Sequence, residues 1–298
     1  MSRTFTPCQI AERSIQKKYR RELWGPFVAA IKRYALIQEN DRIAVCISGG
    51  KDSMLLAKLM QMLQRISDVP FDLSFLVMDP GYAPANRARI EENAARLEIP
   101  IRIFESNVFA VSERMDARKP CYLCAKMRRG YLYHHAQSIG CNKIALGHHF
   151  SDVVETTVMG LLYGGQIQAM RPKLHSNNFP GMELIRPLFC IHEEDIIAWR
   201  NYNRLEFLQC ACRFTEHCAT GEGDSKRLEI KQLLRALRAN CPQLEKNIFN
   251  AIHDVNVDTL LGFNYHGKGP DFLTMFDEEA EKLARLRAGE SGEKSAER

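Results

Sequence analysis

Residues 41–60 read DRIAVCISGGKDSMLLAKLM, an apolar run followed by two glycines and a second apolar run. The first run, Asp41–Ile47, has the composition of a buried strand, and residues 54–60 have the composition of a helix. Two adjacent glycines between them let backbone N–H groups approach an anion at the N-terminus of the helix, where the helix dipole is positive. Strand, glycine loop and helix in this order predict a phosphate-binding site.

The side chains of this loop carry groups that suit phosphate chemistry. Lys51 adds a full positive charge, and Ser48 and Ser53 add hydroxyl donors. Asp52 offers a carboxylate, a ligand that Mg²⁺ accepts readily, so we expect it to hold Mg²⁺ between phosphates. The spacing differs from that of a Walker loop, in which four residues separate the glycines and Ser or Thr follows the Lys.

The hexapeptide Ser48-Gly49-Gly50-Lys51-Asp52-Ser53 resembles the PP-loop of the N-type ATP pyrophosphatases. The resemblance implies that ATP is cut between its α and β phosphates, that AMP passes to a substrate oxygen and that a nucleophile then displaces AMP. It also implies that adenine lies against the strand ends at Val77, Met78 and Gly147. Lys51 would stabilise phosphate charge in the transition state.

Strand-like and helix-like runs alternate beyond this loop. Strands are expected at residues 71–78, 101–104 and 143–146, separated by helices at 87–97 and 125–138. Further helices are expected at 153–163, 193–202, 226–239 and 244–255. This alternation predicts an α/β fold, a doubly wound parallel sheet that binds ligands at the C-terminal ends of its strands.

We expect four parts along the chain. A helical N-terminal extension covers residues 1–40, and a PP-loop ATP pyrophosphatase domain covers 41–190. A helical C-terminal part with a cysteine-rich turn covers 191–276, and a charged tail covers 277–298. The tail is poor in large apolar residues, so we expect it to be disordered. Residues 164–182 are expected to form a long loop.

The composition is typical of a soluble globular protein, with 45% hydrophobic and 26% charged residues among 298. No apolar run approaches the ~20 residues of a membrane span, and the first residues do not resemble a signal peptide. We therefore expect a cytoplasmic protein that does not enter a membrane. Ten cysteines in such a chain favour metal or sulfur chemistry over a disulfide framework.

Two groups of cysteines are candidates for a metal site. Cys121-x-x-Cys124 stands at the start of an expected helix beside a basic cluster, and both features lower the pKa of a thiol. The motif alone fits a zinc knuckle, a redox pair or an iron–sulfur site. Cys210, Cys212 and Cys218 follow about ninety residues later. Two separated groups suggest one metal site assembled by the fold.

A series of motifs in the same order resembles the tRNA-cytidine 2-sulfurtransferase family. The series consists of the PP-loop, Cys121-x-x-Cys124 followed by Arg128-Arg129-Gly130, Gly147-His148-His149 with Asp152, Tyr163-Gly164-Gly165, and Ile185-Arg186-Pro187-Leu188. The resemblance implies ATP-dependent tRNA thiolation, in which a nucleobase oxygen, that of C2 in an anticodon-loop cytidine, is adenylated and replaced by sulfur. It also implies a [4Fe-4S] cluster held by three cysteines, with one iron open to carry sulfide.

The resemblance assigns Cys121 and Cys124 as the first two cluster ligands. The third is Cys210 or Cys212, because this chain has Cys210-x-Cys212 where the family has two residues between the cysteines. The family carries two Asp after the His pair; here Ser151 replaces the first, and Asp152 is the candidate for a second Mg²⁺ or substrate contact. A sulfur donor, either a cysteine desulfurase or inorganic sulfide, is implied, and a homodimer is compatible with the resemblance.

Two basic clusters are candidates for tRNA binding. The first contains Lys17, Lys18, Arg20 and Arg21, and the second, between residues 114 and 129, contains Arg128 and Arg129. Such clusters bind polyanions, although a solvated surface is the alternative for either one. Two other functions stay open: a PP-loop tRNA ligase with a structural Cys₄ zinc site and no sulfur transfer, and a tRNA-binding or sulfur-carrier adaptor without catalysis.

Overall fold

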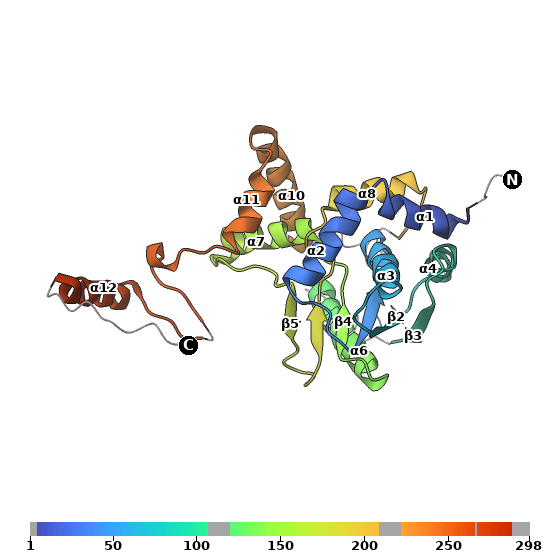
Figure 1. Ribbon diagram of the computed structural model, residues 1–298, viewed down its shortest axis with the longest axis horizontal. Helices are drawn as coiled ribbons and strands as arrows, with labels where there is room; N and C mark the ends of the chain where they lie inside the picture. The colour runs from blue at the N-terminus through green and yellow to red at the C-terminus, as the bar shows by residue number, and fades with distance from the viewer. Residues whose placement is uncertain (1–4, 107–119, 209–221, 266, 288–298) are drawn as a thin grey trace. The chain divides into compact units, whose positions relative to one another are not determined.

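The computed structural model describes residues 5–106, 120–208, 222–265 and 267–287. The chain forms two compact units, residues 1–246 and residues 247–298. The first unit contains the sheet, the helices packed on it and every candidate site residue (Figure 1). No helix in the described parts of the chain is long and apolar enough to cross a membrane.

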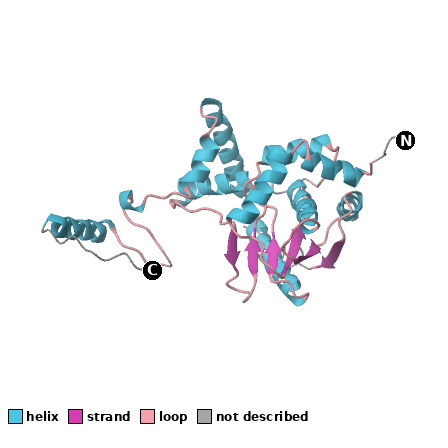
Figure 2. Cartoon of the chain, viewed as in Figure 1, coloured by secondary structure: helices cyan, strands magenta, loops and turns pink. Residues whose placement is uncertain are grey.

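A six-stranded sheet is the centre of the first unit, in the order β3-β2-β1-β4-β6-β5 (Figure 2). Its strands are β1 (Asp41–Ile47), β2 (Phe71–Asp79), β3 (Ile101–Glu105), β4 (Lys143–Ala145), β5 (Lys173–His175) and β6 (Glu183–Ile185). All neighbouring pairs are parallel except β5 with β6, which is antiparallel. The predicted α/β sheet is confirmed.

The prediction of a long loop at residues 164–182 is wrong in part. Strand β5 lies within this range and pairs with β6, with Leu174 opposite Leu184. A three-residue edge strand is too short to leave a periodic signal in the sequence. One strand of the sheet is therefore antiparallel rather than parallel, a common arrangement at the edge of such sheets.

Helices cover both faces of the sheet. Those of the first unit are α1 (Pro7–Gln16), the π-helical turn η1 (Arg20–Trp24), α2 (Gly25–Arg33), α3 (Lys51–Gln64), α4 (Pro84–Arg96), α6 (Pro120–Ser138), α7 (Phe150–Gly164), α8 (Glu193–Tyr202) and α10 (Glu222–Asn240). One buried cluster joins the sheet to α1–α4 and α8, and a second joins it to α6. Along β1 the side chains alternate between them: Ile43 and Val45 belong to the first cluster and Ala44 to the second.

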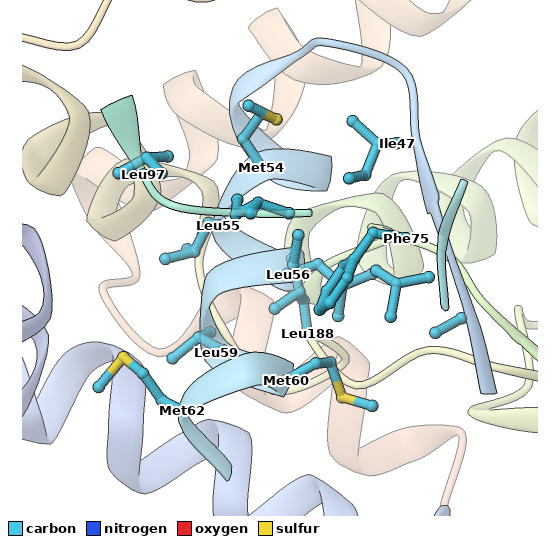
Figure 3. Close-up of a cluster of buried hydrophobic side chains, with 14 of the residues drawn as sticks. Ile47, Met54, Leu55, Leu56, Leu59, Met60, Met62, Phe75, Leu97 and Leu188 are labelled. Carbon is cyan, nitrogen blue, oxygen red and sulfur yellow. The ribbon is translucent and has the colours of Figure 1, made fainter. Parts of the chain in front are cut away.

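Helix α3 is buried on nearly all sides. Every residue from Ser53 to Met60 is buried, including Leu55, Leu56 and Leu59, which contribute to the cluster in Figure 3. A helix that is apolar around its whole circumference belongs in a core. Since the body of α3 cannot move without disturbing that core, its N-terminus is fixed beside the sheet.

The N-terminal extension is helical and is tied to α3 by a buried lysine. The Lys58 side chain is 0% exposed, and its Nζ lies 3.1 Å from Glu12 Oε1 and 3.3 Å from Cys8 Sγ. A buried ammonium is tolerated only where partners of this kind surround it. Glu12 and Cys8 are both on α1, so this contact fastens the first helix of the chain to the helix behind the glycine loop.

The second unit contains the end of α11 (Leu244–Ala251), the 3₁₀ turn η2 (Val257–Thr259) and α12 (Phe272–Arg287). The prediction of disorder from residue 277 is therefore wrong for residues 277–287, which belong to α12. Phe276, Ala280 and Leu283 recur at helical spacing among the charged residues of this segment, and that spacing favours a helix. Residues 288–298 lie outside the described part of the chain.

A buried ion pair crosses the N-terminal end of the sheet. Lys143 of β4, 1% exposed, places its Nζ 2.7 Å from Asp41 Oδ2 of β1 and 3.2 Å from Glu183 Oε2 of β6. The same Nζ donates to Leu36 O at 3.2 Å, in the connection that leads into β1. One ammonium therefore joins three strands.

Lys143→Met should lower the free energy of unfolding by about 3 kcal/mol, because the buried Asp41 carboxylate would lose its counter-charge. Lys173→Met, on the edge strand β5, should cost less than about 1 kcal/mol, since the hydrogen bond from Lys173 Nζ to Ala35 O is exposed. Urea unfolding followed by circular dichroism measures both. Equal stability of the two variants would contradict the role given to Lys143.

Candidate active site

A cavity of about 430 Å³ lies at the C-terminal ends of β1, β2 and β4. The residues that line it are Cys46, Ile47, Ser48, Asp52, Ser53, Met78, Arg128, Arg129, Leu132, Leu146, Gly147, His148, Asp152 and Arg227. Ligands of doubly wound sheets bind at this edge. The predicted site residues Ser48, Asp52, Ser53, Met78 and Gly147 are thus brought together.

The glycine loop has a shape that only small residues permit. Gly49 has φ +83°, and a Cβ there would lie 2.6 Å from Ile90 Cγ1. At Gly147 a Cβ would lie 3.1 Å from the backbone nitrogen of Ser53. Helix α3 follows with Gly50 as its N-cap, and no described side chain caps it. The N-terminus of α3 therefore keeps its N–H donors for an anion.

Two serines hold the loop. The Ser53 hydroxyl donates to Gly50 O at 2.9 Å and accepts from the Ser48 backbone N–H at 3.2 Å. The two hydroxyl oxygens are 3.2 Å apart, and both residues line the cavity. The loop is thus closed on itself before any ligand arrives, which lowers the entropic cost of ordering it around phosphate.

Two carboxylates from different helices meet at His149. His149 is the N-cap of α7, and Asp152 completes a capping box with it. His149 Nε2 lies 3.5 Å from Asp152 Oδ2 and 3.8 Å from Asp52 Oδ1. Asp52 Oδ1 is buried and makes no hydrogen bond within the described chain. A buried carboxylate oxygen of this kind beside the cavity fits a divalent cation, the role expected for Asp52. Both oxygens of Asp152, the second expected ligand, accept hydrogen bonds from the His149 backbone and Arg227.

The described residues contain no group of three or more His, Cys, Asp or Glu side chains arranged to hold a metal ion by themselves. This does not conflict with the expectation for Mg²⁺, because that ion keeps several waters and is usually bound by one or two carboxylates together with substrate phosphates. The protein would supply part of its coordination shell and the nucleotide the rest.

His148 is a neutral side chain in the cavity wall. Burial, reinforced by the positive charge of Arg186, lowers the pKa of His148 to about 4. Its Nδ1 is buried and forms no hydrogen bond within the described residues. Burial also lowers the pKa of Arg186 to about 10, and the guanidinium donates to Arg171 O. At neutral pH His148 therefore offers a polar group without adding charge.

Three arginines give the cavity a positive side. Arg128 and Arg129, named above as candidates for tRNA binding, reach it from α6, and Arg227 reaches it from α10. Arg227 Nη2 donates to Asp152 Oδ1 at 2.9 Å and its Nε donates to Glu155 Oε2 at 2.8 Å. The sequence pattern does not single out Arg227, because nothing local separates it from the other basic residues of α10.

Not all predicted residues line the cavity. The Val77 side chain is 1% exposed and packs in the core, so the contact expected between adenine and this strand end would have to use the backbone of Val77. Gly49 and Gly50 lie in the loop but outside the cavity wall. Lys51 turns towards Glu193 instead, with 3.0 Å between Lys51 Nζ and Glu193 Oε1. Burial lowers the pKa of Lys51, but Asp52 and Glu193 outweigh it and raise the pKa above its ordinary value.

The N-terminal basic cluster is exposed and separate from the cavity wall. Lys17, Lys18, Arg20 and Arg21 follow α1 and continue into η1, and all four are exposed. Lys18 Nζ lies 3.9 Å from the centre of the Tyr202 ring. The geometry is therefore that of a solvent-facing cationic surface, open to a polyanion.

The candidate cluster ligands fall largely outside the described structure. Cys121 and Cys124 belong to the first turns of α6, but their side chains are not described, and Cys210, Cys212 and Cys218 lie in 209–221, outside the described residues. The flanking residue Leu208 is described, and its N–H donates to Gly49 O at 3.1 Å. The five cysteines whose side chains are described are free thiols: Cys8, Cys46, Cys141, Cys190 and Cys241.

Comparison with known proteins gives a consistent result. The family model of the PP-loop domain matches residues 16–212. The tRNA-cytidine(32) 2-sulfurtransferase of Anaeromyxobacter sp. (strain K) is 32% identical over 279 residues, which cover 91% of this chain and 93% of that protein. The enzyme of the same name from Alkalilimnicola ehrlichii is 37% identical over 228 residues, covering 76% of this chain and 70% of that protein.

Among solved structures, the U34-tRNA thiolase NcsA from Methanococcus maripaludis with its [4Fe-4S] cluster has a TM-score of 0.61 at 20% identity, covering 77% of this chain and 76% of that chain. This likeness concerns the fold. The resemblance drawn from the motifs is confirmed by the sequence relatives. The chain belongs to the PP-loop family and, within it, to the tRNA-cytidine 2-sulfurtransferase family.

Proposed function

We propose that the protein is an ATP-dependent tRNA thiolase that adenylates the C2 oxygen of an anticodon-loop cytidine and replaces that oxygen with sulfur. ATP, Mg²⁺ and a [4Fe-4S] cluster with one open iron are its proposed cofactors. The relatives named tRNA-cytidine(32) 2-sulfurtransferase support the substrate and the reaction. NcsA, a U34-tRNA thiolase whose structure contains a [4Fe-4S] cluster, supports the cofactor.

One observation carries the proposal: the helix that contains the first two cysteines lines the cavity, and a residue just before the second cysteine group contacts the glycine loop. Helix α6, which contains Cys121 and Cys124, supplies Arg128 and Arg129 to the cavity wall. Leu208, two residues before Cys210, is hydrogen-bonded to Gly49 of the loop. Phosphate chemistry and sulfur chemistry would then share one site.

The residues of the loop would bind and orient ATP. The N-terminus of α3 and the Ser48 and Ser53 hydroxyls would bind phosphate oxygens, and Lys51 would stabilise the charge that develops as the bond between the α and β phosphates breaks. Asp52 and Asp152 would hold Mg²⁺ through carboxylate oxygens. The nucleobase oxygen attacks the α phosphorus, pyrophosphate leaves, and sulfur then displaces AMP from the base.

Three thiolates would hold the cluster: Cys121, Cys124 and either Cys210 or Cys212. Thiolates are the usual ligands of iron–sulfur clusters, and a site with three of them leaves one iron available. A cluster bound in this way would supply sulfur at the sulfide level for the second step. Inorganic sulfide is a direct source, whereas persulfide sulfur from a cysteine desulfurase would first need a two-electron reductant. The rival reading is a structural zinc site with four cysteine ligands in a tRNA-modifying ligase.

Lys51→Ala should lower the rate of adenylation by about 10²–10³-fold, because an electrostatic partner of the transferred phosphate is lost. Turnover of the wild type should release AMP and pyrophosphate, measured by chromatography of the nucleotides and a pyrophosphate assay. The reading fails if the pure protein releases ADP and orthophosphate with tRNA present.

Cys121→Ala and Cys124→Ala should each abolish bound iron and sulfide after anaerobic purification, because a cluster held by two thiolates is readily lost. Of Cys210→Ala and Cys212→Ala, one should have the same effect. Cys141→Ala and Cys241→Ala are matched controls and should keep the iron. Stoichiometric zinc without sulfide in the wild type would favour the ligase instead.

The quadruple variant Lys17→Ala/Lys18→Ala/Arg20→Ala/Arg21→Ala should bind tRNA more weakly and with a flatter salt dependence. Each phosphate contact contributes about 0.7–0.9 log units of affinity per log unit of salt. Filter binding at a series of salt concentrations measures this, and ATP affinity should stay unchanged. An unchanged slope would mean that this surface is only solvated.

A further inference from the structure

Charged side chains beside the cavity form a closed ring of contacts, and three of them, Asp52, Asp152 and Arg227, line the cavity. The charge ring contains Lys51, Asp52, His149, Asp152, Arg227, Glu155, Lys231 and Glu193, each within 4.0 Å of the next. These residues come from α3, α7 with its N-cap, α8 and α10. The ring therefore links the glycine loop to two helices, α8 and α10, that no phosphate motif includes.

Glu193 is the member of the ring that contacts Lys51 from outside the loop. Its Oε1 accepts from Lys51 Nζ and its Oε2 accepts from Lys231 Nζ, each at 3.0 Å. Its backbone N–H donates to Ser151 Oγ at 3.2 Å, which fixes the start of α8 against α7. Both carboxylate oxygens are occupied by ammonium groups, one from α3 and one from α10.

The carboxylate of Glu193 is a permanent negative charge. Burial raises the pKa of Glu193, but the hydrogen bonds from Lys231 and Lys51 outweigh burial and lower the pKa to about 2. The side chains are 22% exposed for Glu193 and 19% for Lys51, so water screens the pair only in part. At neutral pH the Glu193 carboxylate is ionised, and it contacts Lys51 directly beside Asp52, which lines the cavity.

We propose that Glu193 is a positioning residue for Lys51, which it holds in competition with the phosphates of the nucleotide, and that Lys231 weakens this hold by sharing the carboxylate. The inference rests on the proposed function, because it takes ATP as the ligand of the loop. Lys51 is not among the residues that line the cavity, whereas its neighbours Asp52 and Ser53 are.

Competition follows from charge. A carboxylate and a phosphate oxygen present the same charge to one ammonium group, so binding of either reduces the attraction available to the other. Glu193→Gln keeps the size of the side chain and removes this charge. The variant should therefore bind nucleotide more tightly, whereas loss of a merely structural contact would weaken binding or leave it unchanged.

The experiment is calorimetric titration of the full chain with a Mg²⁺ complex of an ATP analogue that carries a methylene group between the α and β phosphorus atoms. Glu193→Gln should lower the Kd by about three- to tenfold, the effect of one partly screened charge. Lys231→Met should raise the Kd, because Glu193 would then hold Lys51 alone. Lys231→Met should weaken binding less when Glu193 is already Gln.

Glu194→Gln is the matched control. Glu194 is the next acid on α8, but it is exposed and paired with Arg238 rather than with the loop. The Kd of this variant for the ATP analogue should therefore equal that of the wild type. Circular dichroism of each variant checks that it is folded. Binding by Glu193→Gln that is equal to or weaker than that of the wild type overturns the role of Glu193 alone. Lack of analogue binding by the wild type would instead overturn the proposed function.

Discussion

The burial of α3 is the constraint on which the site depends. Residues 53–60 are enclosed by the sheet and by other helices, so the position of α3 relative to β1 is fixed. The distance that the glycine loop must cross between them is therefore fixed as well. Gly49 accepts the positive φ that this span requires, and Gly147 leaves room for the backbone at Ser53. The phosphate-binding geometry is thus a consequence of core packing, with the loop itself contributing little apolar contact.

Electrostatics has to satisfy two opposite demands at this edge of the sheet. Phosphate needs positive charge, whereas Mg²⁺ needs carboxylates, and both kinds of side chain must coexist when no ligand is bound. The charge ring meets this condition by pairing each acid with a base or with His149. Unpaired charges at this degree of burial would destabilise the fold. The charged groups that would contact a bound nucleotide are therefore paired with one another when no nucleotide is present.

The sequence predicted the features that local pattern controls. The glycine loop and the strands at β1, β2 and β3 follow from residues close together in the chain. It missed β5, which is too short to show a period, and it could not tell that the Val77 side chain faces the core. It also missed Glu193 and Arg227. Glu193 looks like an ordinary acid in the first turn of a helix, and only the fold brings it to Lys51.

The contact between Leu208 and Gly49 links the fold to the chemistry. The stretch that ends at Leu208 is held on both sides, since Asn93 Nδ2 of α4 donates to Glu206 O at 2.8 Å and Leu208 donates to Gly49 O. The chain therefore enters the cysteine-bearing residues 209–221 from a fixed point on the glycine loop, and α10 begins at Glu222 with Arg227 and Lys231 on the charge ring. A ligand that draws Lys51 away from Glu193 changes the pairing of Lys231. The charge state of the nucleotide site is in this way coupled to the helix that follows the second group of cysteines.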